Sequence, residues 1–191
     1  MIRGLYDFAT PWSAKGSVWL YSDPHFDDED MVELLGYPPP EVQVDNINKV
    51  AFKNDYIIFL GDIGNPEWLR KLKCKNLVCV LGNHDKGASY YADYFKDIFT
   101  GPVFISDRIL LSHEPVSDTL FCFNFHGHCH GQTENDWRHM NVCADVINFS
   151  PVNLGSVIKS GVLKDIPTIH RLAIDKQIHE KEKDIKKCNQ M

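Results

Sequence analysis

Several short apolar segments of this sequence are followed at once by side chains that can bind metal ions or move protons. The segment at residues 77–81 leads directly into Gly82, Asn83, His84 and Asp85. Four other apolar segments end in the same kind of residue: Asp23 and His25; Asp62; His113; and His126, His128 and His130. Because His, Asp and Asn make a mixed N/O ligand set, they suit Mn, Fe, Zn or Ni, and they lack the thiolates of a structural zinc site.

Two of these groups share a spacing that suits a pair of metal ions. Asp23 and His25 are two residues apart, and His128 and His130 repeat the arrangement. Side chains two apart in an extended segment leave the same side of the backbone, about 7 Å from one another. They can straddle two metal ions about 3.5–4 Å apart, which is the separation used in two-metal phosphoryl chemistry. A dinuclear centre is therefore geometrically reasonable.

The elements that must position these groups read as strands buried on both faces. The apolar runs lie at residues 18–22, 55–60, 77–81, 108–112 and 121–125, and each is short and continuous. Helix-like segments lie between them at 28–36 and at 66–74, where Pro66 occupies a plausible first helical position. This alternation predicts a buried α/β sheet. Ligands bind beyond the strand ends of such sheets, so we expect the polar groups to converge there.

Composition limits the class of protein. A chain of 191 residues with 43% hydrophobic content predicts one domain, which we place at 1–175 before a charged, solvated tail at 176–191. The six cysteines match no zinc-clip spacing and are expected to be reduced. A net charge of −6 argues against the basic surface that binds duplex nucleic acid. With no long apolar run and no secretory signal, we expect a cytoplasmic protein that does not bind membranes and acts on a small substrate.

The ordered motifs resemble those of the calcineurin-like metallophosphoesterases. The matching elements are "SDPH", "LGDI", "LGNHD", "LSHEP" and "HGHCH", which span residues 22–130. The segment at 141–157 is similar to the end of the compact bacterial and phage-type members. The resemblance implies a four-layer α/β/β/α sandwich of two mixed β-sheets flanked by helices. Candidate strands of the second sheet are 103–107, 141–144 and 168–174.

The resemblance also implies a role for each site residue. A first divalent ion would be held by Asp23, His25, Asp62 and His130, and a second by Asp62, Asn83, His113 and His128, with Asp62 bridging the two. The ions would lower the pKa of a bridging water, and the resulting hydroxide would attack a phosphate ester, which we expect to be a phosphodiester. Gly82 would allow a tight turn. His84 would face the phosphate or leaving group, and Asp85 would orient its imidazole.

Some residues have simpler interpretations. An isolated Asp or Asn after a strand is usually a turn former or helix cap, although five ordered motifs argue against this. His126 is interpreted as a buried histidine beside the ligands, and Cys129 should point away from them into the core. The acidic run 27–30 is typical of a helix N-terminus, and near a phosphate site it would also repel a polyanion. Arg138 could bind phosphate or form an exposed salt bridge.

Departures from other branches of the family narrow the function. The segment "GDIGNPEW" lacks the G-D-x-x-D-R-G pattern of the protein serine/threonine phosphatases and dinucleoside tetraphosphatases. Asp23 stands where the RNA-debranching branch has Cys, and the chain lacks the length and basic charge of the repair nucleases. Of the branches considered, the sequence therefore favours a compact phosphoesterase. The alternatives are a non-catalytic scaffold on the same fold, like the retromer subunit, or a single-strand nuclease, which the acidic run disfavours.

Overall fold

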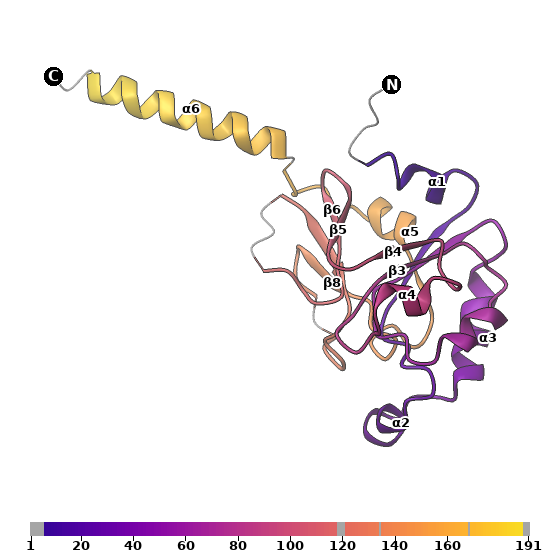
Figure 1. Cartoon of the computed structure of the whole chain (residues 1–191). Coiled ribbons are helices and arrows are strands. Elements are labelled where there is room, and N and C mark those ends of the chain that lie inside the picture. The colour runs from indigo at the N-terminus through magenta and orange to yellow at the C-terminus, as the bar shows by residue number, and fades with distance from the viewer. Residues whose placement is uncertain (1–5, 118–120, 134, 168, 189–191) are drawn as a thin grey trace.

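Two β-sheets lie face to face in the computed structural model, which describes residues 6–117, 121–133, 135–167 and 169–188 (Figure 1). One sheet has the strand order β4-β3-β2-β1-β9 and the other has the order β5-β6-β7-β8. The strands of the first sheet are β1 (Val18–Tyr21), β2 (Tyr56–Phe59), β3 (Leu77–Val80), β4 (Asp97–Phe99) and β9 (Val152–Asn153). Those of the second are β5 (Val103–Ser106), β6 (Ile109–Leu111), β7 (Phe123–His126) and β8 (His139–Asn141).

Both sheets are mixed, as predicted. In the first sheet β1, β2, β3 and β4 are parallel and β9 pairs antiparallel with β1. In the second sheet β6, β7 and β8 are parallel and β5 pairs antiparallel with β6. Because the parallel strands of each sheet end at the same edge, the loops that follow β1, β2 and β3 are neighbours, as are those that follow β6 and β7.

The strands are buried on both faces, which explains why they are continuous apolar runs. Between the sheets, Leu20 and Ile58 of the first sheet belong to one core cluster with Leu111 and Phe125 of the second. On the outer face of the first sheet, alternate residues pack under helices; Phe59, for example, shares a cluster with Ile47. The side chains of β1, β2 and β3 are therefore packed on both faces of the first sheet.

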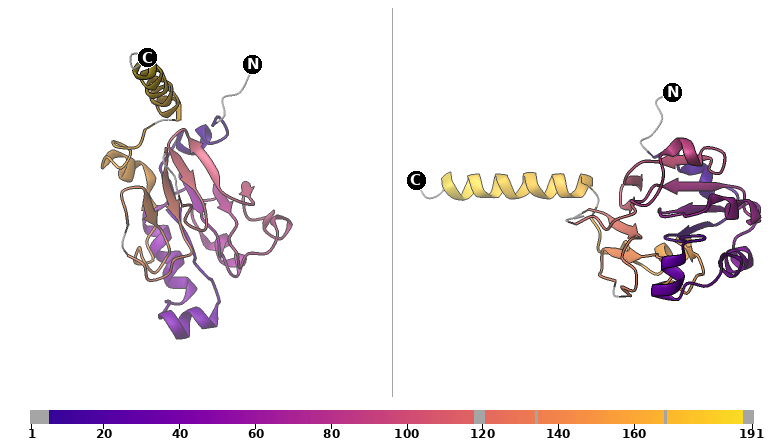
Figure 2. Two further views of the ribbon diagram at one scale, coloured as in Figure 1. Left: turned by 90° about the vertical axis from the view of Figure 1, so that its left-hand side faces the viewer. Right: turned by 60° about the horizontal axis from the view of Figure 1, so that its bottom comes forward.

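Helices flank this sandwich (Figure 2). The helices α3 (Pro40–Val50) and α4 (Ala88–Tyr91) and the 3₁₀ helix η1 (Pro66–Lys71) contribute residues to the core cluster on the outer face of the first sheet. The short helices α1 (Thr10–Ser13) and α5 (Leu154–Lys159) contribute to the cluster between the sheets, and α2 (Glu29–Leu35) follows β1. This arrangement confirms the predicted fold class. Within the described residues, no helix has the length and hydropathy needed to cross a bilayer.

Three predicted elements differ in the structure. The segment at 66–74 was expected to be an α-helix, but it forms η1 and ends at Lys71; Pro66 does begin it. Of the predicted strand at 141–144, only Asn141 belongs to a named strand, although Cys143 forms a bridge to Ser22. The prediction of a strand at 168–174 is wrong from Ile169 on, and Thr168 lies outside the described residues.

That last segment begins the helix α6 (Ile169–Cys188), which leads away from the sandwich in Figures 1 and 2. No Gly or Pro separates the apolar start of α6 from its charged remainder, which is rich in the helix formers Lys, Glu and Gln. The helix therefore continues through both parts. Since the predicted domain boundary at 175 falls inside α6, that boundary stays a prediction.

Candidate metal centre

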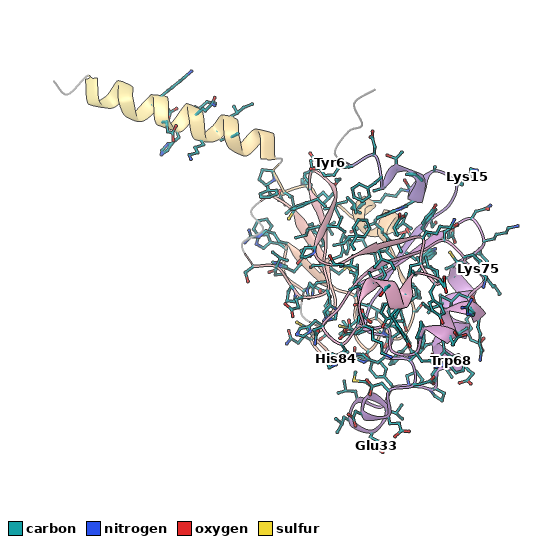
Figure 3. All side chains as sticks on the ribbon, in the orientation of Figure 1. Tyr6, Lys15, Glu33, Trp68, Lys75 and His84 are labelled. Atoms are coloured by element: carbon teal, nitrogen blue, oxygen red, sulfur yellow. The ribbon has the colours of Figure 1, made fainter. Side chains whose placement is uncertain are left out.

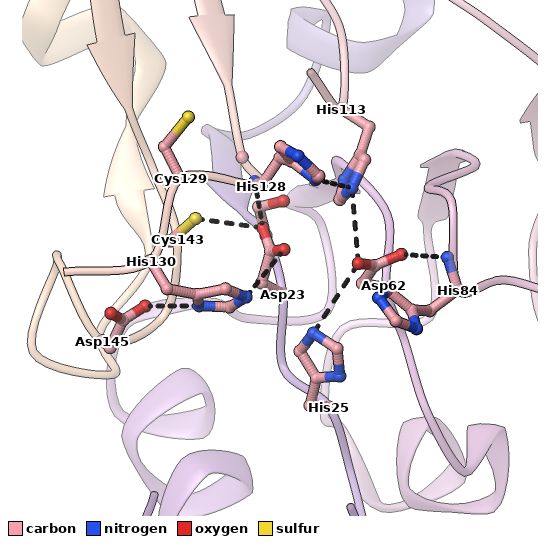
Figure 4. Close-up of polar contacts among 12 residues, drawn as sticks. Asp23, His25, Asp62, His84, His113, His128, Cys129, His130, Cys143 and Asp145 are labelled. Carbon is pink, nitrogen blue, oxygen red and sulfur yellow. Dashed lines mark hydrogen bonds and ion pairs between the residues drawn. The ribbon is translucent and has the colours of Figure 1, made fainter. Parts of the chain in front are cut away.

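The polar residues that follow five strands meet at one end of the two sheets (Figure 4). His84 marks this end in Figure 3, where Tyr6 and Lys15 lie at the opposite end of the sandwich. The first sheet brings Asp23 and His25 after β1, Asp62 after β2, and Asn83, His84 and Asp85 after β3; the second brings His113 after β6 and His128 and His130 after β7. The predicted convergence is therefore present, and both sheets contribute to it.

Two buried carboxylates, Asp23 and Asp62, form the middle of the site. His130 Nε2 lies 3.5 Å from Asp23 Oδ1, and His25 Nε2 lies 3.7 Å from Asp62 Oδ2. His113 Nε2 approaches the same Asp62 oxygen to 3.3 Å. Within the described chain, Asp23, His25 and His130 can each place one ligand atom within 4.8 Å of the others, as can Asp23, Asp62 and His113.

A second group of donor atoms lies on the more exposed side of the site. Asn83 Oδ1 is 2.7 Å from His113 Nε2 and 3.0 Å from His128 Nδ1. The two histidine nitrogens are 3.3 Å apart. Asn83 and His128 are exposed, whereas His113 is buried. The seven residues predicted as metal ligands thus form two adjoining groups that differ in their access to solvent.

Two buried atoms of the site test whether these residues fit a metal ion. Among the described residues, Asp23 Oδ1 and His25 Nε2 are buried and have no hydrogen-bond partner. A buried polar atom without a partner costs about 1–3 kcal/mol, and more if it is charged. The other nitrogen of His25, Nδ1, already bonds to Asp28 Oδ2 at 2.9 Å, which leaves Nε2 with a free lone pair. A divalent cation would satisfy both atoms, so the donor set fits the predicted ions.

The backbone at four of the ligands is in the left-handed region. The φ angles are 56° at Asp23, 44° at His25, 53° at Asp62 and 66° at His128. This conformation is uncommon for residues other than glycine, and each instance costs about 1–3 kcal/mol. The surrounding fold must supply that free energy, so the packing around the site fixes the backbone at these four ligands.

Two motif glycines allow the backbone to pass directly against the carboxylates. A Cβ atom at Gly82 would lie well under 3.0 Å from Asp62 Oδ1, and one at Gly127 would lie equally close to Asp23 Oδ2. Since Gly82 is not among the described glycines with positive φ, it is needed for space, in contrast to the expected tight turn. The two motif glycines are therefore needed for the positions of the Asp62 and Asp23 carboxylates.

His84 lies at the edge of the centre with its imidazole exposed. Its backbone N–H donates to Asp62 Oδ1 at 2.9 Å, and its ring centroid is 5.7 Å from that of His25. The side chain lines an open pocket of about 630 Å³ whose other wall is formed by residues 26–30 at the start of α2. His84 can therefore contact a molecule in this pocket from its position beside the predicted ligands.

The expected role of Asp85 is corrected by its contacts. Its carboxylate accepts hydrogen bonds from the backbone N–H groups of Asp62 (2.9 Å), Ile63 (2.9 Å) and Gly82 (2.8 Å), and from the Tyr91 hydroxyl (2.9 Å). These donors occupy both oxygens, so Asp85 does not orient the His84 imidazole. It fixes the loops after β2 and β3 relative to one another.

The charges of the centre shift the pKa values of its residues. Burial alone would lower the pKa of His113, but its bond to Asp62 and the nearby charge of Asp23 outweigh burial and raise the pKa to about 9. Burial likewise opposes the shift at Asp62, whose pKa is nevertheless held below its ordinary value by His113, by the His84 N–H and by His25. Without a bound cation, Asp62 and His113 form an ion pair at neutral pH.

The structure adds residues to which sequence reasoning gave no role. Asp145 Oδ1 lies 3.1 Å from His130 Nδ1, and Tyr37 donates its hydroxyl to the same oxygen at 3.1 Å. Cys143 Sγ is 3.2 Å from Asp23 Oδ2. Asp145 and Cys143 lie in the segment 141–157, whose resemblance to the family was the available signal. No comparable sequence signal marked Tyr37.

The remaining candidates have the following positions. The run 27–30 begins α2, as predicted, with Asp28 as the N-cap residue. His126 is buried, also as predicted, and burial is the main cause of its lowered pKa. Cys129 points away from the centre in Figure 4, but it is half-buried and outside both core clusters. Arg138 stacks over the Trp137 ring at 4.5 Å, so its phosphate contact stays a prediction.

Comparison with known proteins gives a family and two uncharacterised relatives. The family model described as calcineurin-like phosphoesterase matches residues 16–180. The uncharacterized protein MJ1445 of Methanocaldococcus jannaschii is 26% identical in an alignment of 167 positions that covers 74% of this chain and 89% of that protein. The crystal structure of AQ665 from Aquifex aeolicus, a protein of unknown function, is similar with a TM-score of 0.64 and 25% identity, covering 75% of this chain and 98% of that one.

Proposed function

The chain belongs to the calcineurin-like phosphoesterase family, and from this membership we propose that it is a metal-dependent hydrolase that cleaves a small phosphodiester. The observation that carries the proposal is the pair of buried atoms without partners, Asp23 Oδ1 and His25 Nε2, at the meeting point of the ligand residues. Bound cations would satisfy both atoms, which supports a metal centre at this point.

Two divalent ions fit the donor set, and Mn, Fe, Ni and Zn all suit it. Asp23, His25, Asp62 and His130 would hold one ion, and Asp62, Asn83, His113 and His128 the other. When bound, such ions attract the negatively charged phosphate and lower the pKa of a coordinated water toward neutrality. The carboxylates of Asp23 and Asp62 only partly offset the charge of two divalent ions, so the centre stays attractive to a phosphate anion.

His84 is the residue that we assign to the substrate. Its backbone N–H is fixed on Asp62 Oδ1 at 2.9 Å, and its imidazole is exposed beside the pocket. A histidine in this position can donate a hydrogen bond to the phosphate or a proton to the departing alcohol. The carboxylate of Asp85 is bonded to other groups, so it does not fix the orientation of the His84 ring. The ring can therefore rotate to face either the phosphate or the departing alcohol.

The charge around the pocket favours a small substrate. Four acidic residues, Asp27, Asp28, Glu29 and Asp30, line it with a single cation, Lys86. A run of phosphates would be repelled there, which argues against the alternative of a single-strand nuclease. The scaffold alternative is disfavoured because all seven predicted ligands and His84 are retained. We expect neither duplex nucleic acid nor a membrane among the partners, and a cytoplasmic location.

The test is hydrolysis by purified protein loaded with Mn²⁺, Ni²⁺ or Zn²⁺. Bis(4-nitrophenyl) phosphate and 4-nitrophenyl phosphate would compare a diester with a monoester, followed by diesters of alkyl alcohols. We expect diester hydrolysis that is lost on chelation and in Asp62→Asn, together with up to two bound ions per chain in wild type by elemental analysis. A wild-type protein that holds two ions and cleaves none of these esters would instead support the scaffold.

A further inference from the structure

We propose that Asp145 is a positioning residue for the metal centre, which sets the tautomer of His130 so that Nε2 presents a lone pair to a metal ion. The inference rests on the metal binding assumed in the proposed function. No motif of the sequence assigned a role to Asp145, and its side chain lies behind His130 on the side away from Asp23 (Figure 4).

The contacts of Asp145 hold it firmly against the imidazole. Its Oδ1 is 3.1 Å from His130 Nδ1, and its Oδ2 accepts the backbone N–H of Gly131 at 2.6 Å. The Tyr37 hydroxyl donates to Oδ1 at 3.1 Å and also lies 3.1 Å from the backbone carbonyl of Asp23. Both carboxylate oxygens therefore have assigned partners, and the group cannot rotate away without breaking several bonds.

An ionised carboxylate can only accept hydrogen bonds, so the proton between Asp145 and His130 must be on Nδ1. In the neutral imidazole the other nitrogen, Nε2, is then unprotonated, and it faces Asp23 Oδ1 at 3.5 Å. The neutral imidazole with a free lone pair is the form that binds metals, and a hydrogen bond on the opposite nitrogen is what fixes it. Tyr37 could donate to His130 Nδ1, 3.2 Å away, and so produce the wrong tautomer. Asp145 prevents this by accepting the Tyr37 proton itself.

Two other histidines of the site also have a hydrogen-bond acceptor at Nδ1. His25 Nδ1 bonds to Asp28 Oδ2 at 2.9 Å, and His113 Nδ1 bonds to the carbonyl of Leu60 at 2.8 Å. In each case the partner is an acceptor, and Nε2 faces the shared carboxylate of Asp62. Three imidazoles thus have an acceptor on the far side, which supports a positioning role for Asp145 over a chance surface contact.

Replacing Asp145 with Asn should reverse the tautomer of His130. The short bond from Gly131 N–H requires an acceptor, so the amide oxygen would take the place of Oδ2 and the NH₂ group would face His130 Nδ1. That NH₂ can only donate, which makes Nδ1 the acceptor and moves the imidazole proton to Nε2. A protonated Nε2 points N–H at the place where a metal would bind, so His130 is lost as a ligand.

The experiment measures Mn²⁺ binding by equilibrium dialysis, without reference to hydrolysis. We expect Asp145→Asn to bind one of two ions about 10–100-fold more weakly and the other as in wild type. The control is Asp136→Asn, because Asp136 forms a similar pair with His139 (Nδ1 to Oδ2, 2.8 Å) that is not part of the centre. This control should bind both ions as wild type does.

A double-mutant cycle with His130→Ala separates positioning from general destabilisation. If Asp145 acts through His130, Asp145→Asn should not weaken Mn²⁺ binding further in the His130→Ala background. Equal binding by wild type and Asp145→Asn, or an undiminished effect of Asp145→Asn in that background, would overturn the proposal.

If Asp145→Asn fails to fold, ¹⁵N NMR of Zn²⁺-loaded wild-type protein can test the proposal instead. We expect the His130 proton on Nδ1, and a proton on Nε2 would contradict the positioning role. Because none of these readouts uses hydrolysis, a protein that binds two ions but cleaves no ester would refute the proposed function alone.

Discussion

The backbone N–H of His128 donates to the buried Oδ2 of Asp23 at 3.0 Å, so a loop of the second sheet fixes a carboxylate of the first. Gly127 makes this approach possible, because a Cβ atom at that position would overlap Ser22 Oγ and Asp23 Oδ2. The approach of this loop to Asp23 therefore depends on Gly127, which has no side chain.

We expect Gly127→Ala to displace Asp23 and to destabilise the protein by about 1–3 kcal/mol, the usual effect of overpacking a well-packed site. The matched control is Gly101→Ala, since a Cβ atom at Gly101 would meet nothing within 4 Å. Urea unfolding and Mn²⁺ binding of both variants would measure the effects. Wild-type metal binding by Gly127→Ala would show that the loop can move aside.

His84→Ala should separate catalysis from metal binding. Because the side chain lies outside the ligand group, both ions should stay bound while turnover falls about 10²–10⁴-fold, the usual contribution of general acid catalysis. The loss should be smaller for an aryl ester, which leaves as a stabilised phenolate, than for an alkyl ester. The measurement is kcat/KM of wild type and variant across leaving groups of different pKa at equal metal loading. An equal loss for both esters would mean that His84 only anchors the phosphate.

Asp85→Ala should show the opposite pattern. Removing the carboxylate leaves the N–H groups of Asp62, Ile63 and Gly82 without their acceptor, and each such group costs about 1–3 kcal/mol if water does not reach it. We therefore expect a lower thermal midpoint and weaker metal binding, with no dependence on the leaving group. If Asp85→Ala instead kept its stability and reproduced the leaving-group pattern of His84→Ala, Asp85 would act through the His84 imidazole after all.

Stability of the chelator-treated protein should decrease as the pH rises from about 6.5 to about 9. The pKa of His113 is raised in the folded state from 6.5 to about 9, so the folded state holds this proton more tightly than the unfolded chain does. The resulting stabilisation is complete below pH 6.5 and is lost as the pH passes through about 9. The expected change, on the order of 1–3 kcal/mol, would be measured by urea unfolding at several pH values. His113→Gln should show a flatter profile, and an unchanged slope would assign the effect elsewhere.

The five apolar runs correctly predicted β1, β2, β3, β6 and β7, and motif order predicted that the polar residues after them meet, because both are local signals. The sequence failed where the partner of a residue is distant in the chain. Tyr37 meets Asp145 across 108 residues, and no local pattern reports such a contact. For the same reason the contacts of Asp85 could not be predicted: it is adjacent to His84 in sequence, but its carboxylate accepts from the backbone N–H groups of Asp62 and Ile63, 23 and 22 residues earlier. The start of α6 was taken for a strand because this apolar segment is short and gives little periodicity.

The order of the ligand residues along the chain determines when the centre can form during synthesis. Asp23, His25, Asp62 and Asn83 follow strands β1 to β3 of the first sheet, whereas His113, His128 and His130 follow β6 and β7 of the second sheet, which are made later. A nascent chain that ends before β7 lacks two histidine ligands, the N–H that fixes Asp23 and the acceptor behind His130. Strands β1 to β3 are therefore made before the histidines of the second sheet, so we expect the full ligand set to assemble only after β7 and the loop that follows it have been synthesised.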